Sequence, residues 1–247
     1  MNSLSRPRPA ALITSHPDDC RMFDEHNEPV YYPGYRVDAM TDRAVEFISR
    51  PRGAPFFFFV SYLEPHHQND LDQFVPPERY AETYRNPYVP PDLKARPGNW
   101  QESLPGYYGC VKALDDALGR VLAALQDAGI ADQTIVLFTS DHGCHFRTRN
   151  AEYKRSCHDG CTRIPMVMQG PGVGRGRTVP QLVSLIDAPP TLLSAAGLPV
   201  PRVMQGRDAT VLLDGGEADW EDEVFIQISE YTVGRAIRTK RWKYSVH

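Results

Sequence analysis

The fold is decided by residues 134–143, which read Thr134-Ile135-Val136-Leu137-Phe138-Thr139-Ser140-Asp141-His142-Gly143. The apolar run at 134–140 is typical of a strand that is covered on both faces in a sheet flanked by helices. It ends at a carboxylate, an imidazole and a glycine that lets the backbone turn sharply. Asp141 and His142 suit a divalent cation, although alone they fit a loop-capping carboxylate beside an incidental histidine equally well.

Two further apolar runs predict strands, one over 56–63 and a shorter one over 164–168 that closes at a Gly-Pro-Gly turn. Apolar residues recur at three and four positions over 37–48, before the first of these runs, and over 111–125, between them, which predicts two helices. A further helix is expected between Asp187 and Gly197.

The expected alternation of strands and helices indicates an α/β layered domain, in which ligands bind beyond the carboxyl ends of strands. The two strongest strands deliver Glu64-Pro65-His66-His67 and Asp141-His142 to that edge. Residues 70–101 are rich in Pro, Tyr and Asn and predict a long ordered excursion.

Composition excludes several classes of protein. The chain has 247 residues, of which 41% are hydrophobic and 23% charged, so it can bury a large core as one domain or part of one. Its net charge of −4, without a Lys/Arg run, gives no footprint for nucleic acid or an anionic membrane.

The N-terminus shows no apolar run of signal-peptide length, so a cytoplasmic location is the default expectation and export is expected only if a longer form carries a signal. Five scattered cysteines favour reduced thiols over a disulfide scaffold.

A second chemical segment follows at 152–165, where Lys154 offers a compact positive charge suited to a sulfate or phosphate oxygen. Five residues later come an acidic residue and a glycine, and then Arg163-Ile164-Pro165. Such a lysine is weak evidence by itself, because most Lys-Arg pairs lie on solvated surfaces.

The ordered combination of Pro65-His66, residues 140–143, Lys154 and residues 163–172 resembles the sulfatases of the alkaline phosphatase superfamily. Segments 34–38, 114–119 and 184–191 also resemble recurrent sulfatase segments. The resemblance implies an α/β fold with a central mixed or mostly parallel sheet flanked by helices and incomplete at both ends. It divides the chain into a partial catalytic domain, 1–215, and the start of a C-terminal segment, 216–247.

The same resemblance implies residue roles. Asp141 and His142 resemble the second pair of ligands for the metal, which in sulfatases is usually calcium. Lys154 and His66 resemble the lysine and the histidine that bind the sulfate, and the histidine also helps to protonate the leaving group. His67 stands beside His66 and can be confused with it, whereas His145 and Arg147 are assigned to the substrate on proximity alone.

The chain departs from the family in its nucleophile. Sulfatases convert a cysteine or serine in Cys/Ser-x-Pro/Ala-x-Arg to formylglycine, and no cysteine or serine here has that sequence after it. The first Asp-Asp metal pair is not convincingly present either. We therefore expect a reading frame truncated at both ends, with a degenerate paralogue as the lesser alternative. A formylglycine-generating or anaerobic maturation enzyme is an expected partner only of a full-length form.

Four other interpretations stay open at this point. Segment 16–19, His-Pro-Asp-Asp, resembles the zinc motif of N-acetylglucosaminyl deacetylases. The cysteines and histidines at 144–145, 157–158 and 161 offer ligands for structural zinc. Asp-His-Gly also occurs in the hydrolases of the superfamily that cleave phosphonates or phosphodiesters. Finally, the missing nucleophile fits a catalytically inactive fragment.

Overall fold

The computed structural model describes residues 16–24, 26–51, 53–213, 215, 219–230 and 233–246. It divides into two compact units. Unit 1 contains Asn99–Ala131 and the described residues before Arg96, and unit 2 contains Arg96–Gly98 and the described residues from Asp132 onward.

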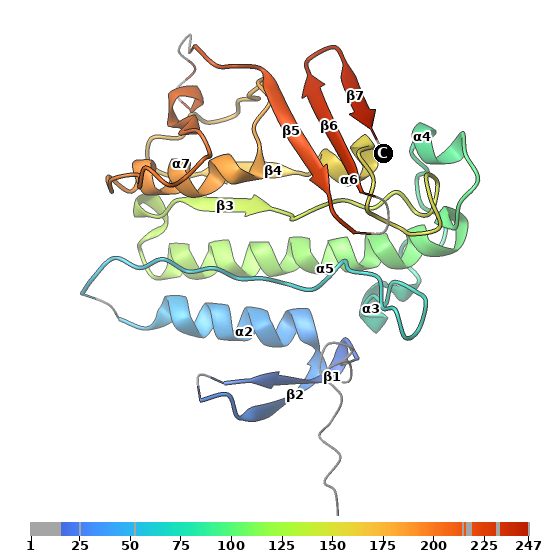
Figure 1. Cartoon of the computed structure of the whole chain (residues 1–247). Coiled ribbons are helices and arrows are strands. Elements are labelled where there is room, and N and C mark those ends of the chain that lie inside the picture. Colours follow the sequence, from blue (N-terminus) through green and yellow to red (C-terminus); the bar gives the residue numbers. More distant parts are fainter. Residues whose placement is uncertain are drawn as a thin grey trace, which may run out of the picture. The chain divides into compact units, whose positions relative to one another are not determined.

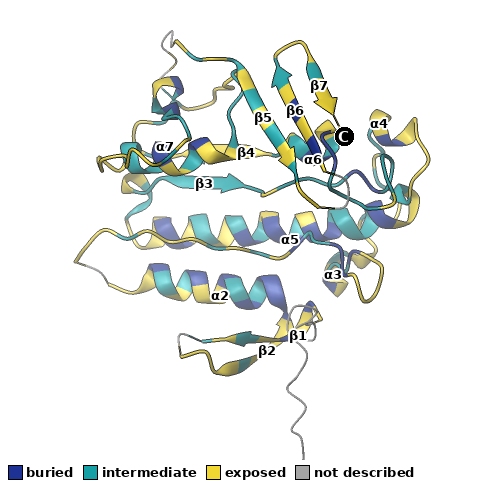
Figure 2. Cartoon of the chain, viewed as in Figure 1, coloured by how far each residue is buried: buried dark blue, intermediate teal, exposed yellow. Residues whose placement is uncertain are grey.

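Unit 1 is a helical layer with a β-hairpin (Figure 1). In the hairpin, β1 (Asp18–Phe23) pairs antiparallel with β2 (Pro29–Tyr35). The helices are α2 (Arg36–Ser49), α3 (Glu78–Ala81), α4 (Pro91–Lys94) and α5 (Trp100–Asp127). The apolar faces of α2 and α5 pack together, which confirms both predicted helices (Figure 2). Their core cluster consists of Tyr35, Val37, Ala113, Leu114 and Ala117.

Helix α5 begins well before the predicted helix at 111–125, at the end of the predicted ordered excursion over 70–101. Pro105 lies inside α5, in its second turn, where it removes the helical hydrogen bond to the Gln101 carbonyl. Gly106 is needed for packing, because a Cβ there would stand 2.3 Å from the carbonyl oxygen of Phe74. Gly129, with φ of 67°, closes the helix as predicted.

The predicted strand at 56–63 is wrong, because no described residue pairs with this segment in a sheet. The segment nevertheless alternates as a strand does. Phe58 stacks on Phe47 of α2 with ring centroids 4.3 Å apart, whereas Phe57 and Phe59 are 78% and 76% exposed. An apolar run favours extended backbone, but a strand also requires a hydrogen-bonded neighbour, which a local pattern does not supply.

Unit 2 contains two small sheets. β3 (Val136–Thr139) pairs antiparallel with β4 (Met166–Gln169), which confirms the strands predicted at 134–140 and 164–168. β5 (Glu223–Ile228), β6 (Gly234–Thr239) and β7 (Lys243–Val246) form an antiparallel sheet. The helices of unit 2 are α6 (Asp159–Thr162) and α7 (Ala188–Ala195), with short 3-10 turns at Leu185–Asp187 and Ala209–Leu212. Another 3-10 turn, Ala131–Gln133, lies where the chain passes between the units.

The α/β class is confirmed. The strand pairs among the described residues are antiparallel, whereas the sequence predicted a mixed or mostly parallel sheet. Short connections explain this for β1–β2 and β5–β6–β7, because a parallel neighbour needs a long crossover. The predicted boundary between residues 215 and 216 stays a prediction.

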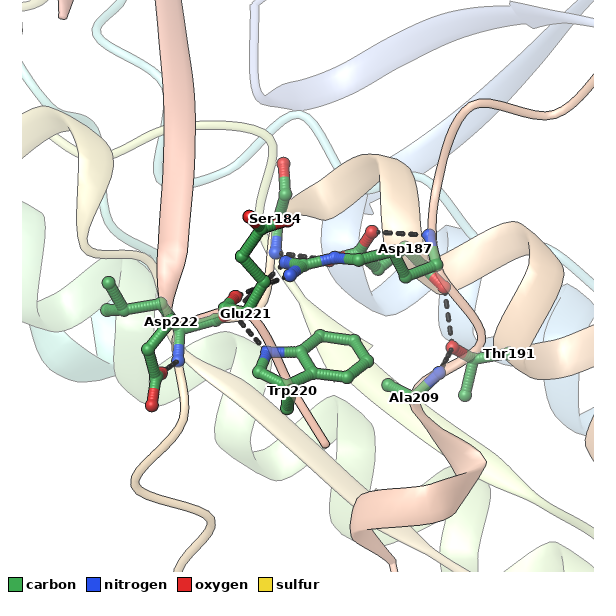
Figure 3. A network of polar contacts seen from close by, with 9 residues as sticks. Ser184, Asp187, Thr191, Ala209, Trp220, Glu221 and Asp222 are labelled. Atoms are coloured by element: carbon green, nitrogen blue, oxygen red, sulfur yellow. Dashed lines mark hydrogen bonds and ion pairs between the residues drawn. The ribbon is translucent and has the colours of Figure 1, made fainter. Parts of the chain in front are cut away.

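A buried carboxylate organises the start of α7 (Figure 3). Asp187 accepts hydrogen bonds from the backbone N–H groups of Ser184, at 2.8 Å, and Arg207, at 2.7 Å. The Arg207 guanidinium lies 4.0 Å from the ring centroid of Trp220, whose indole N–H donates to the Leu182 carbonyl. Segment 184–191, which resembles a recurrent sulfatase segment, thus has a structural role. Its Asp187 is 1% exposed and hydrogen-bonded within the fold.

Candidate metal and sulfate site

The end of β3 presents two potential metal ligands next to each other. The Asp141 carboxylate accepts from the backbone N–H of His142 at 2.8 Å, and its Oδ2 lies 3.5 Å from His142 Nε2. Ser140 Oγ donates to the His142 carbonyl at 2.9 Å, which tightens the turn. Gly143 is required here, because a Cβ would stand 2.2 Å from the Gly160 carbonyl oxygen.

Lys154 lies against this pair, with its Nζ 3.2 Å from His142 Nε2. Because an ammonium group only donates, Nε2 accepts, and the ring proton is on Nδ1, which lies 3.0 Å from the Gly143 carbonyl. A backbone carbonyl commonly holds a metal-binding histidine in this tautomer. Unit 2 therefore brings the predicted residues Asp141, His142 and Lys154 together and directs a lone pair of His142 toward a positive charge.

His145 is buried, with 2% of its surface exposed. Its Nε2 lies 3.1 Å from the Lys154 carbonyl oxygen, and burial lowers the pKa of the imidazole. The neutral ring therefore holds the backbone at Lys154. Within the described part of the chain, its Nδ1 has no hydrogen-bond partner. The predicted contact of His145 with substrate stays a prediction, and its geometry is that of a supporting residue.

The turn after His145 has an uncommon backbone. Phe146 and Arg147 have φ of 50° and 56°, a left-handed conformation that side chains other than glycine rarely adopt. Gly98 lies close beside this turn, since a Cβ there would stand 2.5 Å from the Phe146 carbonyl oxygen. The Arg147 side chain is partly buried, and its role at the substrate stays a prediction.

His66 and His67 belong to unit 1. His67 is buried, with its Nδ1 3.3 Å from Asn69 Oδ1 and its ring edge-on to Phe74, so its contacts are those of a structural residue. His66 is half-buried, and its Nδ1 lies 2.6 Å from the carbonyl oxygen of His67.

Sequence reasoning missed the ion pair that precedes His66. Arg36 Nη2 lies 2.7 Å from Glu64 Oε1, and both side chains are buried. The second oxygen of Glu64 has no hydrogen-bond partner among the described residues. A glutamate directly before Pro65-His66 and an arginine at the start of an apolar helix were visible in the sequence. Their pairing was not, because they stand 28 residues apart.

The described residues contain no group of three or more His, Cys, Asp or Glu side chains placed to hold a metal ion. The open zinc interpretations therefore gain no support. Asp19 instead accepts from the Gly34 N–H at 2.8 Å. All five cysteines are free, as predicted, and burial raises the pKa of the Cys144 thiol to about 12, which disfavours thiolate.

Asp141 and His142 fit half of a metal site. Their donors converge, His142 is in the tautomer of a ligand, and the Asp141 side chain is 81% exposed and open to a cation. Two side chains leave most positions around a divalent cation to other ligands.

The family profile described as Sulfatase matches residues 13–198, more than half of the chain. The chain belongs to the sulfatase family. A second profile, described as N-sulphoglucosamine sulphohydrolase, C-terminal, matches residues 151–246. Members of the sulfatase family generally use a divalent metal and a formylglycine nucleophile.

Two curated relatives cover most of this chain. The steryl-sulfatase of Mus musculus is 31% identical over 243 residues, with 90% of this chain and 35% of the relative covered. The ulvan-active sulfatase of Formosa agariphila is 28% identical over 243 residues, with 90% and 46% covered. The chain thus spans less than half the length of these two sulfatases.

Solved structures give the same fold. The sulfatase-family protein yidJ of Bacteroides fragilis superposes with a TM-score of 0.78 at 26% identity, over 90% of this chain and 51% of that one. The phosphonate monoester hydrolase of Agrobacterium radiobacter gives a TM-score of 0.70 at 24% identity, over 85% and 52%. The alkaline phosphatase-like fold is therefore confirmed.

Proposed function

We propose that this chain is part of an enzyme that hydrolyses sulfate esters with the help of a divalent metal. The observation that carries the proposal is the convergence of Asp141, His142 and Lys154 at the end of β3. These residue types supply metal ligands and a cation for the sulfate oxygens in one place. Membership of the sulfatase family supports the same reaction class.

The chemistry follows from charge. A sulfate ester gathers negative charge on its oxygens as the bond to the leaving group breaks, and preorganised positive groups stabilise that charge. Lys154 would contact a sulfate oxygen, and Asp141 with His142 would hold the metal, which we propose is calcium. A bound divalent metal supplies further positive charge to the same oxygens.

The other residues have smaller parts in the proposal. His66 binds sulfate and gives a proton to the leaving group, as the sulfatase resemblance implies, and Arg147 contacts the substrate. We assign His145 to holding Lys154 and His67 to supporting its own loop, on the contacts described above. The printed sequence contains no formylglycine motif, so no residue here is assigned as nucleophile.

A sulfated carbohydrate is the substrate class that we propose. The ulvan-active sulfatase is a relative of this chain. A protein solved in complex with its substrate D-glucosamine-2-N,6-O-disulfate shares the fold, with a TM-score of 0.76 at 20% identity over 94% of this chain and 64% of that one. The proposal names the class of ester and leaves the individual sugar open.

Turnover of an aryl sulfate and of an aryl phosphodiester in calcium tests this function, both in a longer form that carries a formylglycine motif and in this chain alone, with Asp141→Ala as the control in each. We expect any turnover to favour the sulfate and to disappear in the variant. Faster cleavage of the diester would support the phosphodiesterase alternative. Absence of turnover by a chain that still binds calcium and sulfate would support the inactive-fragment alternative.

A further inference from the structure

The segment that carries Lys154 is held by side chains from the C-terminal sheet of unit 2. This segment runs from Glu152 to Thr162 and ends in α6. It contains a backbone distortion directly after the sulfate-binding candidate, because Arg155 has φ of 63°. A left-handed arginine is uncommon and persists only where surrounding contacts hold it.

Lys243 of β7 makes three contacts to the last part of this segment. Its Nζ donates to the Cys157 carbonyl at 2.7 Å and to Thr162 Oγ1 at 3.3 Å, and it forms a short ion pair with Asp159. The Lys243 side chain is only 16% exposed. The ammonium group therefore spans α6 from the residues before it to its last residue.

A second bridge holds the first part of the segment. Arg155 Nη1 lies 2.7 Å from Glu152 Oε2, and Arg155 Nη2 lies 2.7 Å from Glu230 Oε2. Glu152 belongs to the segment itself, whereas Glu230 follows β5 of the C-terminal sheet. The two bridges thus hold the segment at Arg155 and at Asp159, on the C-terminal side of Lys154.

Charge-assisted hydrogen bonds are about twice as strong as neutral ones, and partial burial reduces their screening by solvent. Lys243 meets both conditions. Lys240, in the turn between β6 and β7, does not, since its side chain is 59% exposed and pairs with Asp222, which lies outside the segment. Lys240 is therefore a matched control for the loss of one surface lysine.

We propose that Lys243 is a positioning residue that fixes the Lys154 segment, so that the C-terminal sheet sets the place of the sulfate-binding ammonium. Arg155 and Glu230 support it from the other end. The proposal rests on the proposed function only in naming sulfate as the anion that Lys154 meets. The contacts of Lys243 with the Lys154 segment, which we call the tether, are a property of the fold.

Three variants test the tether: Lys243→Met, which removes the charge, Lys243→Arg, which keeps it, and Lys240→Met as control. The first readout is the acetylation rate of the Lys154 amine, mapped by mass spectrometry. The second is amide exchange over residues 152–163, and the third is the affinity for inorganic sulfate measured by calorimetry. Circular dichroism checks that each variant is folded.

In Lys243→Met we expect the Lys154 amine to be acetylated faster and the amides of residues 152–163 to exchange faster. We expect its sulfate affinity to be about fivefold or more weaker, as for a typical coupling between sites. Lys243→Arg is expected to restore most of the affinity, and Lys240→Met to match the parent. If Lys243→Met unfolds the chain, Glu230→Gln removes only the exposed bridge and is expected to shift all three readouts less, in the same direction.

Unchanged acetylation and sulfate affinity in a folded Lys243→Met variant would overturn the tether, as would an equal effect of Lys240→Met. Failure of the proposed function looks different. In that case Lys154→Met binds sulfate as well as the parent does, or the parent binds none, while the acetylation and exchange of Lys243→Met still decide whether the tether exists.

Discussion

At the scale of single residues, Lys154 is the residue that we propose binds the sulfate, because its ammonium lies beside His142 at the end of β3. Lys154→Met keeps much of the aliphatic stem and removes the charge. Loss of a charged hydrogen-bond partner costs about 1.5–3 kcal/mol, so we expect sulfate affinity to fall roughly tenfold or more. Calorimetry with inorganic sulfate measures the change. The control is Lys94→Met in α4, and equal binding by Lys154→Met and the parent would contradict the assignment.

His145 gives a pH-dependent stability of known sign. Burial lowers the pKa of its imidazole in the folded chain, so the unfolded chain binds more protons as the pH falls through the ordinary value of about 6.5. Stability from this residue is therefore present above pH ~6.5 and is lost as the pH falls below it. His158 acts in the same direction, because burial also lowers its pKa.

Urea unfolding at a series of pH values from about 7.5 to 5 measures this effect. We expect the parent to lose stability on acidification and His145→Asn to lose less, since it no longer carries that titrating ring. His158→Asn is the comparison that separates the two histidines. Equal slopes for the parent and His145→Asn would show that His145 titrates alike in the folded and unfolded chain.

At the scale of elements, the helices predicted at 37–48 and 111–125 were correct, because the spacing of apolar residues indicates both the helix and the face that it buries. Strands β3 and β4 were predicted correctly from their apolar runs, whereas β1, β2, β5, β6 and β7 were not predicted. Residues 56–63 carry the strongest apolar run and form no strand, since pairing depends on residues far away in sequence. The beginning of α5 was missed because Pro105 and Gly106 look like loop residues.

Substitution of Gly106 tests why α5 has a glycine at this position. A Cβ at Gly106 would stand 2.3 Å from a backbone oxygen of Phe74, whereas Gly119 of the same helix has nothing within 4 Å. We expect Gly106→Ala to destabilise the chain by about 1–3 kcal/mol through overpacking. Gly119→Ala is expected to stabilise it by roughly 0.5–1 kcal/mol through helix propensity. Thermal or urea unfolding measures both, and equal effects would contradict the packing role of Gly106.

The same difference between local patterns and distant contacts decides which residues of the site could be predicted from the sequence. Asp141, His142 and Lys154 were predictable because the ordered combination of short segments that carries them resembles the sulfatases, although neither the strand end nor the lysine was decisive alone. The Arg36–Glu64 pair and the contacts of Lys243 were not, because their partners are 28 and more than 80 residues apart. His145 was assigned by proximity in sequence, and only the structure shows that its buried ring contacts the Lys154 carbonyl.

At the scale of the whole molecule, the chain is a sulfatase-family polypeptide, and we propose that Asp141 and His142 form half of a metal site. Within the described residues, no helix is long and apolar enough to span a membrane. The family match covers residues 13–198, and the ligand pair at the end of β3 lies inside it. The central claim is that Asp141 and His142 bind a divalent cation.

Calorimetric titration of calcium into the chain, the Asp141→Asn variant and the Asp115→Asn variant tests that claim most directly. Asp115 is the control because it is an exposed aspartate on α5, which belongs to unit 1 and not to the unit that contains β3. The structure predicts calcium binding by the parent, at least tenfold weaker binding by Asp141→Asn because a charged ligand is lost, and parent-like binding by Asp115→Asn. Equal calcium affinity in the parent and Asp141→Asn, or no calcium binding by the parent, would contradict it.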